Sequence, residues 1–85
     1  MKILIEYCAT WNYFPQASSV EAELKADYPG SDIELIKGSG GIFDVKCNGI
    51  LIYSRQNIEG QRFPNKGELS KLIKEKVGWV LYTWH

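Results

Sequence analysis

The architecture of this 85-residue chain follows from residues 2–15, whose sequence is KILIEYCATWNYFP. The uninterrupted apolar run at residues 3–5 predicts a strand over residues 2–7, buried on both faces of a mixed sheet. Pro15 is typical of the first turn of a helix, because the N–H that proline lacks would have no partner there. A short loop, residues 8–13, therefore joins a strand to a helix, and it begins with Cys8.

The next part of the chain continues this alternation. The helix that contains Pro15 has one apolar face, because its apolar residues recur at spacings of three and four, and Pro29-Gly30 ends it. The residues of that face are Ala17, Val20, Leu24 and Tyr28. Residues 33–37 predict a second strand and residues 42–47 a third, with a glycine-rich break between them.

Asn48-Gly49 predicts a tight hairpin, because a type I′ turn requires positive φ at both central residues. The hairpin joins the third strand to a fourth one at residues 50–54. A last helix follows a polar loop, and Asn65 and Glu68 stand at capping-box spacing at its start. The apolar face of this helix consists of Leu69, Leu72, Ile73 and Val77. Gly78 is expected to cap its end.

These elements give the order β-α-β-β-β-α in a single domain over residues 1–85. The first strand–helix–strand unit is expected to be a right-handed crossover between parallel strands, whereas the last two strands pair antiparallel. A mixed four-stranded sheet covered by two helices is an α/β two-layer sandwich, and its plan is that of a minimal thioredoxin-like domain. The aromatic tail, residues 79–85, receives no assigned element.

Charge and composition exclude several classes of protein. Ten Lys and Arg residues balance ten Asp and Glu residues, whereas nucleic-acid and anionic-membrane binders need a basic patch. No apolar run approaches the roughly 20 residues that span a bilayer, and the beginning of the chain lacks the features of a signal peptide. Two cysteines are too few for a secreted disulfide scaffold, and with His85 they lack zinc-ligand spacing. A cytoplasmic setting is therefore expected.

Cys8 is the candidate reactive residue because of its place in the fold. Sites in open α/β sheets gather at the carboxyl ends of strands, and the N-terminus of a following helix can activate a thiol. The alternative is a buried cysteine that acts as a small hydrophobic side chain, as free cysteines commonly do. Position alone leaves both interpretations open.

The Cys8 loop resembles the corresponding loop of the selenoprotein W-related, or Rdx, family, which carries Cys-x-x-Cys or Cys-x-x-selenocysteine after its first strand. Three further segments resemble that family in the same order, namely Gly40-Gly41-Ile42-Phe43-Asp44-Val45, Gly49-Ile50-Leu51-Ile52-Tyr53-Ser54-Arg55 and Gly60-Gln61-Arg62-Phe63-Pro64. The resemblance covers about residues 2–77. It implies a thioredoxin-like redox protein with no bound cofactor, which reacts through Cys8 with glutathione or protein thiols.

The departure from the family pattern lies at Trp11, where the second redox residue should stand. An indole forms neither a disulfide nor a selenenylsulfide, so the chain as written cannot cycle a two-residue redox pair, and its standing as an enzyme stays open. Cys47 is not expected to replace that residue. It ends a strand that runs away from Cys8, and five strand residues cover roughly 17 Å, whereas the Cα atoms of a disulfide lie within about 7 Å of each other.

Two interpretations of Trp11 follow. Selenocysteine is encoded by UGA and tryptophan by UGG, and a host without the insertion signal can read UGA as tryptophan. The first hypothesis is therefore that residue 11 is naturally selenocysteine, whose selenol attacks the substrate while Cys8 resolves the intermediate. The alternative is a non-catalytic interaction module with an apolar surface around the loop. The aromatic residues that would form this surface are Trp11, Tyr13, Phe14 and Phe63.

Overall fold

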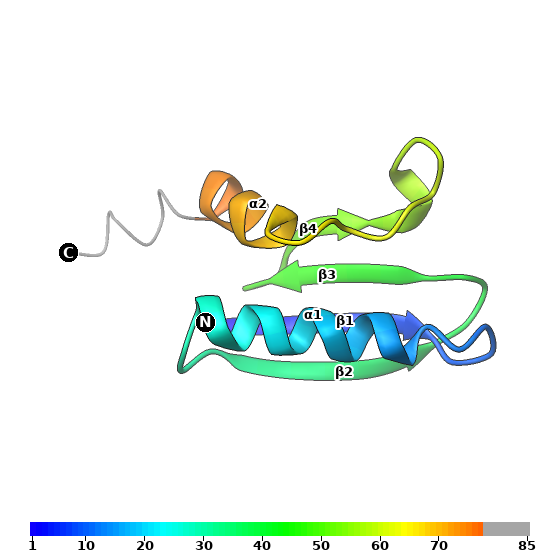
Figure 1. The fold of residues 1–85 in the computed structure, drawn as a ribbon, viewed down its shortest axis with the longest axis horizontal. Coiled ribbons are helices and arrows are strands. Elements are labelled where there is room, and N and C mark those ends of the chain that lie inside the picture. Colours follow the sequence, from blue (N-terminus) through cyan, green and yellow to red (C-terminus); the bar gives the residue numbers. More distant parts are fainter. Residues whose placement is uncertain (78–85) are drawn as a thin grey trace.

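The strand expected at the beginning of the chain is β1 (Lys2–Cys8), and it takes a central place in the sheet (Figure 1). The structure, a computed structural model, describes residues 1–77. The other elements are α1 (Phe14–Asp27), β2 (Asp32–Gly38), β3 (Phe43–Cys47), β4 (Ile50–Ser54), the short 3-10 turn η1 (Arg55–Asn57) and α2 (Glu68–Lys76). The predicted order is confirmed, with strand ends shifted by at most one residue. The turn η1 was not predicted.

The sheet has the strand order β2-β1-β3-β4. β1 and β2 run parallel, as expected of a strand–helix–strand crossover, and β3 pairs antiparallel with both β1 and β4. The predicted mixed four-stranded sheet is therefore confirmed. This topology brings the carboxyl ends of β1, β2 and β4 to one edge of the sheet, together with the start of β3 (Figure 1).

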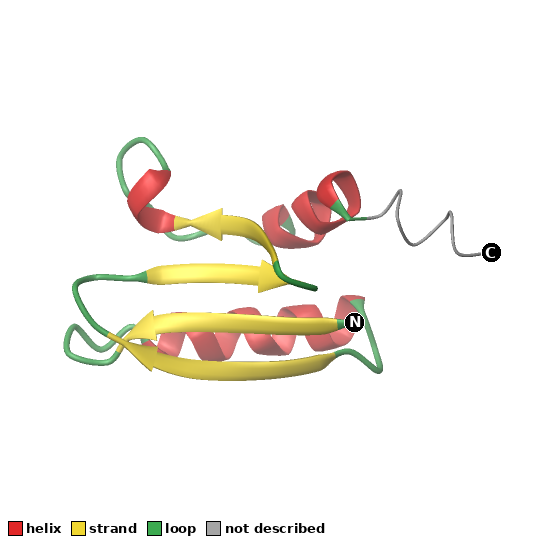
Figure 2. Cartoon of the chain, turned by 180° about the vertical axis from the view of Figure 1, so that it is seen from behind, coloured by secondary structure: helices red, strands yellow, loops and turns green. Residues whose placement is uncertain are grey.

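Both helices contribute to a single apolar core on one face of the sheet. Figure 2 shows the opposite face, with α1 behind the strands. The side chains that are fully buried in this core include Ile3, Ile5, Phe43, Val45, Leu24, Leu69 and Ile73. The prediction that the first strand is buried on both faces was wrong. Leu4 points to the face that neither helix covers and is partly exposed. Buried and partly exposed residues therefore alternate along most of the strand, despite its continuous apolar run.

Local turn chemistry explains how the strands and the last helix are joined. Asn48 and Gly49 have φ values of 52° and 83°, which confirms the predicted hairpin turn. The last helix begins after Gly67, which has a φ of 84°, and half of the predicted capping box is formed, because the N–H of Asn65 donates to Oε1 of Glu68 over 2.9 Å. The predicted cap at Gly78 and the aromatic tail lie outside the described residues.

Candidate functional site

Three loops meet at the sheet edge that receives the carboxyl end of β1. They are the Cys8 loop (residues 8–13), the glycine loop between β2 and β3 (residues 39–42) and the segment after β4 (residues 55–64), all at the right-hand end of Figure 1. Backbone hydrogen bonds tie the start of the Cys8 loop to the glycine loop and to the end of β2. The N–H of Cys8 donates to the carbonyl of Ile42 over 2.8 Å, and the N–H of Ala9 donates to that of Gly38 over 3.1 Å. The backbone of Cys8 is thus held on both sides.

The Cys8 loop folds back on itself before α1 begins. The N–H of Asn12 donates to the carbonyl of Ala9 over 3.1 Å, and the N–H of Tyr13 donates to the carbonyl of Cys8 over 3.0 Å. Asn12 has a φ of 56°, a left-handed conformation that asparagine tolerates better than most residues. This turn carries the backbone of residue 11 over the cysteine, and the N–H of Trp11 donates to Sγ of Cys8 over 3.3 Å.

The structure combines features of both interpretations of Cys8. The side chain is fully buried, as expected of a small hydrophobic residue. Its sulfur nevertheless lies at the end of β1, under a turn of the loop, and accepts a backbone hydrogen bond from residue 11. A reagent can therefore reach Sγ only when the Cys8 loop moves, and the nearest residue for a second redox group is residue 11.

The Trp11 side chain is 59% exposed. Its indole lies across the glycine loop, since a Cβ added to Gly41 would stand 2.5 Å from Cζ3 of the ring. The indole also approaches Tyr13 edge to face, with 6.0 Å between the ring centroids. Residue 11 therefore presents its backbone to Cys8 and its side chain to the surface.

The predicted aromatic surface forms only in part. Tyr13 and Phe63 meet edge to face with centroids 4.8 Å apart, and Phe63 meets Phe43 at 5.2 Å. We call Trp11, Tyr13, Phe63 and Phe43 the aromatic cluster. Phe14 lies outside it, because its ring contacts Tyr7 at 5.8 Å and remains 49% exposed.

Arg55 also belongs to this site, although the sequence alone marks it only as the last residue of a segment that resembles the Rdx family. Its guanidinium lies over the rings of Tyr13 and Phe63, with its Cζ 5.3 and 5.1 Å from their centroids. A signal for it was present in the predicted topology. β4 runs parallel to β1, so the residue that follows β4 must emerge at the edge where Cys8 lies.

Cys47 lies at the opposite end of the sheet from Cys8. It pairs with Ile3 in the β1–β3 ladder, five residues before Cys8, and the ladder therefore places the two cysteines at opposite ends of β1. Both cysteines are free thiols. Burial raises the pKa of the Cys47 thiol, because an apolar environment disfavours its thiolate.

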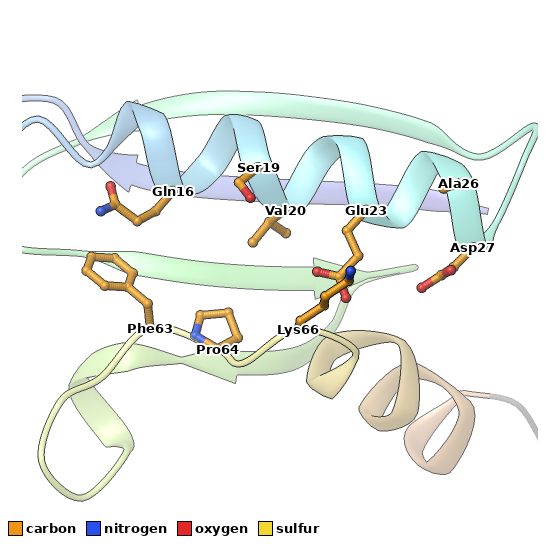
Figure 3. Close-up of a pocket in the computed structure, with 9 residues that line it drawn as sticks. All are labelled: Gln16, Ser19, Val20, Glu23, Ala26, Asp27, Phe63, Pro64 and Lys66. Atoms are coloured by element: carbon orange, nitrogen blue, oxygen red, sulfur yellow. The ribbon is translucent and has the colours of Figure 1, made fainter.

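A groove of about 500 Å³ lies beside the aromatic cluster, between α1 and residues 63–66 (Figure 3). Gln16, Val20 and Phe63 line it, and Phe63 is the residue that it shares with the cluster. Within residues 1–77, no group of three His, Cys, Asp or Glu side chains is arranged to hold a metal ion. None of the helices described is long and apolar enough to cross a bilayer.

Proteins of similar sequence show the family to which this chain belongs. The sequence profile of the Rdx family matches residues 2–75. Migration and invasion enhancer 1 of Bos taurus is 30% identical over 74 residues, which cover 87% of this chain and 63% of the relative. The Mus musculus protein of the same name is 31% identical over 72 residues, which cover 85% and 61%. The chain thus spans less than two thirds of the length of these relatives.

Solved structures agree in fold. A selenoprotein W-related protein from Vibrio cholerae superposes with a TM-score of 0.76 at 25% identity, covering 87% of this chain and 92% of that one. A Bordetella parapertussis protein superposes with a TM-score of 0.79 at 24% identity, covering 89% and 96%. The resemblance inferred from the sequence is confirmed, and the chain belongs to the Rdx family, with the thioredoxin-like fold of selenoprotein W-related proteins.

Proposed function

We propose that this protein is a thiol–selenol redox protein in which Cys8 and residue 11 form the reacting pair. The observation that carries the proposal is the 3.3 Å hydrogen bond from the N–H of residue 11 to Sγ of Cys8. A reactive atom on the side chain of residue 11 would start from a backbone already in contact with the sulfur, which favours bond formation between the two. The family to which the chain belongs supports a thioredoxin-like redox role.

The proposed chemistry needs only glutathione as a co-reactant. A selenolate at residue 11 attacks one sulfur of glutathione disulfide, forms a selenenylsulfide with that glutathione and releases the other as a thiolate. The Cys8 thiolate then attacks the selenium atom of this selenenylsulfide. An internal S–Se bond forms, the bond from selenium to glutathione breaks, and the second glutathione leaves as a thiolate. The pair loses two electrons and the disulfide gains them, and the reverse sequence reduces the pair again. A reducing compartment such as the cytoplasm would supply this partner.

Trp11 blocks the closing step in the chain as written, because an indole cannot take part in it. We therefore propose that the natural residue at position 11 is selenocysteine, translated here as tryptophan. The codon decides this part of the proposal. A genomic UGA at position 11 supports it, and a genomic UGG ends it.

The redox proposal itself is tested with a Trp11→Cys variant and a Trp11→Ser control. After incubation with glutathione disulfide, the mass of Trp11→Cys is expected to be lower than that of the reduced variant by two hydrogen atoms. Residues 8 and 11 are then expected not to react with an alkylating reagent. Trp11→Ser is expected to stop at a mixed disulfide on Cys8. A folded Trp11→Cys variant that also stops at the mixed disulfide would contradict the proposal.

Two exposed rings favour a second candidate, a non-catalytic interaction module. Trp11, in the aromatic cluster, is 59% exposed, and Phe14, outside it, is 49% exposed; large exposed apolar side chains can mark a surface for a protein partner. A genomic UGG at position 11, together with a redox-inactive Trp11→Cys variant, would select this candidate over the redox protein.

A further inference from the structure

Arg55 is the first residue after β4, at the sheet edge where β1 ends in Cys8. Its guanidinium is held by two rings, with Cζ 5.3 Å from the centroid of Tyr13 and 5.1 Å from that of Phe63. These contacts remove much of the water around the charge, and the residue as a whole is only partly exposed. Its position is therefore set by packing, unlike that of a solvated surface arginine.

The charge of Arg55 lacks a carboxylate partner among residues 1–77. The ion pairs formed there use Lys2, Lys25 and Arg62 as cations, and Nε of Arg55 is buried without a hydrogen-bond acceptor. A partly desolvated cation without a partner is unfavourable, and two aromatic faces offset only part of that cost. An anion bound to the guanidinium would offset the rest of this free-energy cost.

The guanidinium is close to the proposed redox pair. Tyr13, which it covers, donates its N–H to the carbonyl of Cys8 over 3.0 Å and meets the Trp11 ring at 6.0 Å. A single ring thus separates Arg55 from residue 11. The neighbouring Gln56 donates from Nε2 to the carbonyl of Gly40 over 2.8 Å, which ties η1 to the glycine loop under the indole.

We propose that Arg55 binds the glycine carboxylate of glutathione, the thiol substrate of the proposed redox reaction. Glutathione fits this role, because its reactive sulfur belongs to cysteine and its terminal carboxylate to the glycine that follows. The two residues are about 3.5 Å apart along an extended chain. The planar guanidinium matches a carboxylate through two parallel hydrogen bonds. The inference rests on the proposed redox function and assigns to Arg55 the recognition of its substrate.

The experiment measures mixed-disulfide formation at Cys8 in the full chain by peptide mass mapping. Three disulfides are compared: glutathione disulfide, its diester with both glycine carboxylates blocked, and neutral 2-hydroxyethyl disulfide. In the unmutated protein, glutathione disulfide should react about tenfold faster than its diester after correction for their intrinsic rates, as expected for one charge-assisted contact. Because this comparison needs no substitution, it does not depend on the folding of a variant.

Arg55→Gln should remove this advantage, lowering the rate with glutathione disulfide about tenfold while leaving the rate with 2-hydroxyethyl disulfide within about twofold. Lys37→Gln is the matched control. Lys37 is an exposed cation opposite Tyr7 near the same sheet edge, so its loss changes the net charge equally without touching the aromatic cluster. It should leave both rates unchanged.

The possible failures are distinguishable. If Cys8 of the chain with Trp11 reacts with none of the three disulfides, the Arg55 inference fails, whereas the redox function is decided separately by the Trp11→Cys variant. If Cys8 reacts but the diester matches glutathione disulfide, or if Arg55→Gln slows all three equally, the redox function stands and Arg55 is not the carboxylate site. An equal effect of Lys37→Gln would reduce the role of Arg55 to general electrostatic attraction and would overturn the inference as well.

Discussion

The N–H of Trp11 is directed at Sγ of Cys8 over 3.3 Å, whereas the indole of Trp11 lies over Gly41 on the outside of the loop. The hydrogen bond comes from the backbone, so any residue at position 11 other than proline can make it. The indole contacts depend on the side chain and would be lost with selenocysteine or cysteine. The backbone hydrogen bond to Cys8, which supports the proposed chemistry, therefore does not depend on tryptophan at position 11, whereas the contacts with Gly41 do.

Cys8 is predicted to react with iodoacetamide before Cys47, by about tenfold or more, because a loop opens at lower free energy than a core strand. Both side chains are fully buried, but Cys47 belongs to β3 and pairs with Ile3 in the sheet. Burial also raises the pKa of Cys47, which lowers its thiolate fraction near neutral pH. Time-resolved mass mapping of the two peptides checks the order.

The same labelling in denaturant provides the control, because both thiols should react at similar rates once the chain is unfolded. Labelling of Cys47 first in the folded protein would show that the Cys8 loop does not open more readily than the core. In that case the interpretation of Cys8 as a buried hydrophobic residue would prevail.

Gly41→Ala is predicted to destabilise the protein through two effects that can be separated. Gly41 has a φ of 78°, which costs an alanine roughly 1–2 kcal/mol. The new Cβ would also press on the Trp11 indole, which must swing away. In a Trp11→Ala background only the first effect remains, so we expect a coupling of roughly 0.5–1 kcal/mol between the two substitutions in urea unfolding.

Gly40→Ala is the matched control for this cycle. Gly40 has a φ of 72°, but a Cβ there would meet no atom within 4 Å, so it carries the backbone cost alone. It should show no coupling to Trp11→Ala. Equal coupling for both glycines would mean that the indole does not rest on Gly41.

Much of the fold could be predicted from local sequence signals. Apolar spacing located α1 and α2, and Asn48-Gly49 located the hairpin, because these signals act within a few residues of each other. The sequence could not show that the face of β1 bearing Leu4 stays uncovered. That depends on both helices packing on the same side, which is a long-range property of the fold.

The positions of Cys8 and Trp11 could be predicted from the sequence, but neither their contacts nor the place of Arg55 could. The strand-to-helix position of Cys8 and the anomaly at Trp11 are visible in the sequence. The hydrogen bond between them depends on the left-handed conformation of Asn12, and the place of Arg55 depends on two rings from distant segments. Such contacts follow from tertiary packing, which single-residue preferences do not encode.

Glu68→Gln is predicted to lower stability by roughly 1 kcal/mol at pH 7, after allowance for solvent screening of a partly exposed pair. The Glu68 carboxylate accepts hydrogen bonds from both terminal nitrogens of Arg62, at 2.7 and 2.9 Å, and from the N–H of Asn65 at 2.9 Å. Arg62 in the first place, and then the N–H of Asn65, lower the pKa of Glu68 from 4.5 to about 2. The effect of the substitution should therefore depend on pH.

The sign follows from linkage. A carboxyl group whose pKa is lower in the folded state stabilises the fold fully above its unfolded pKa, and this contribution is lost as the pH falls through the folded value. The difference between the parent and Glu68→Gln should thus be constant above about pH 5 and shrink steadily between 4.5 and about 2. Urea unfolding across this range measures it. Glu21→Gln is the control, because Glu21 has a similar exposure but a longer contact of 3.7 Å to Lys25, and it should lower stability by much less than Glu68→Gln. A Glu68→Gln difference that stays constant down to pH 2 would mean that the lost contribution is packing and not the charge held by Arg62.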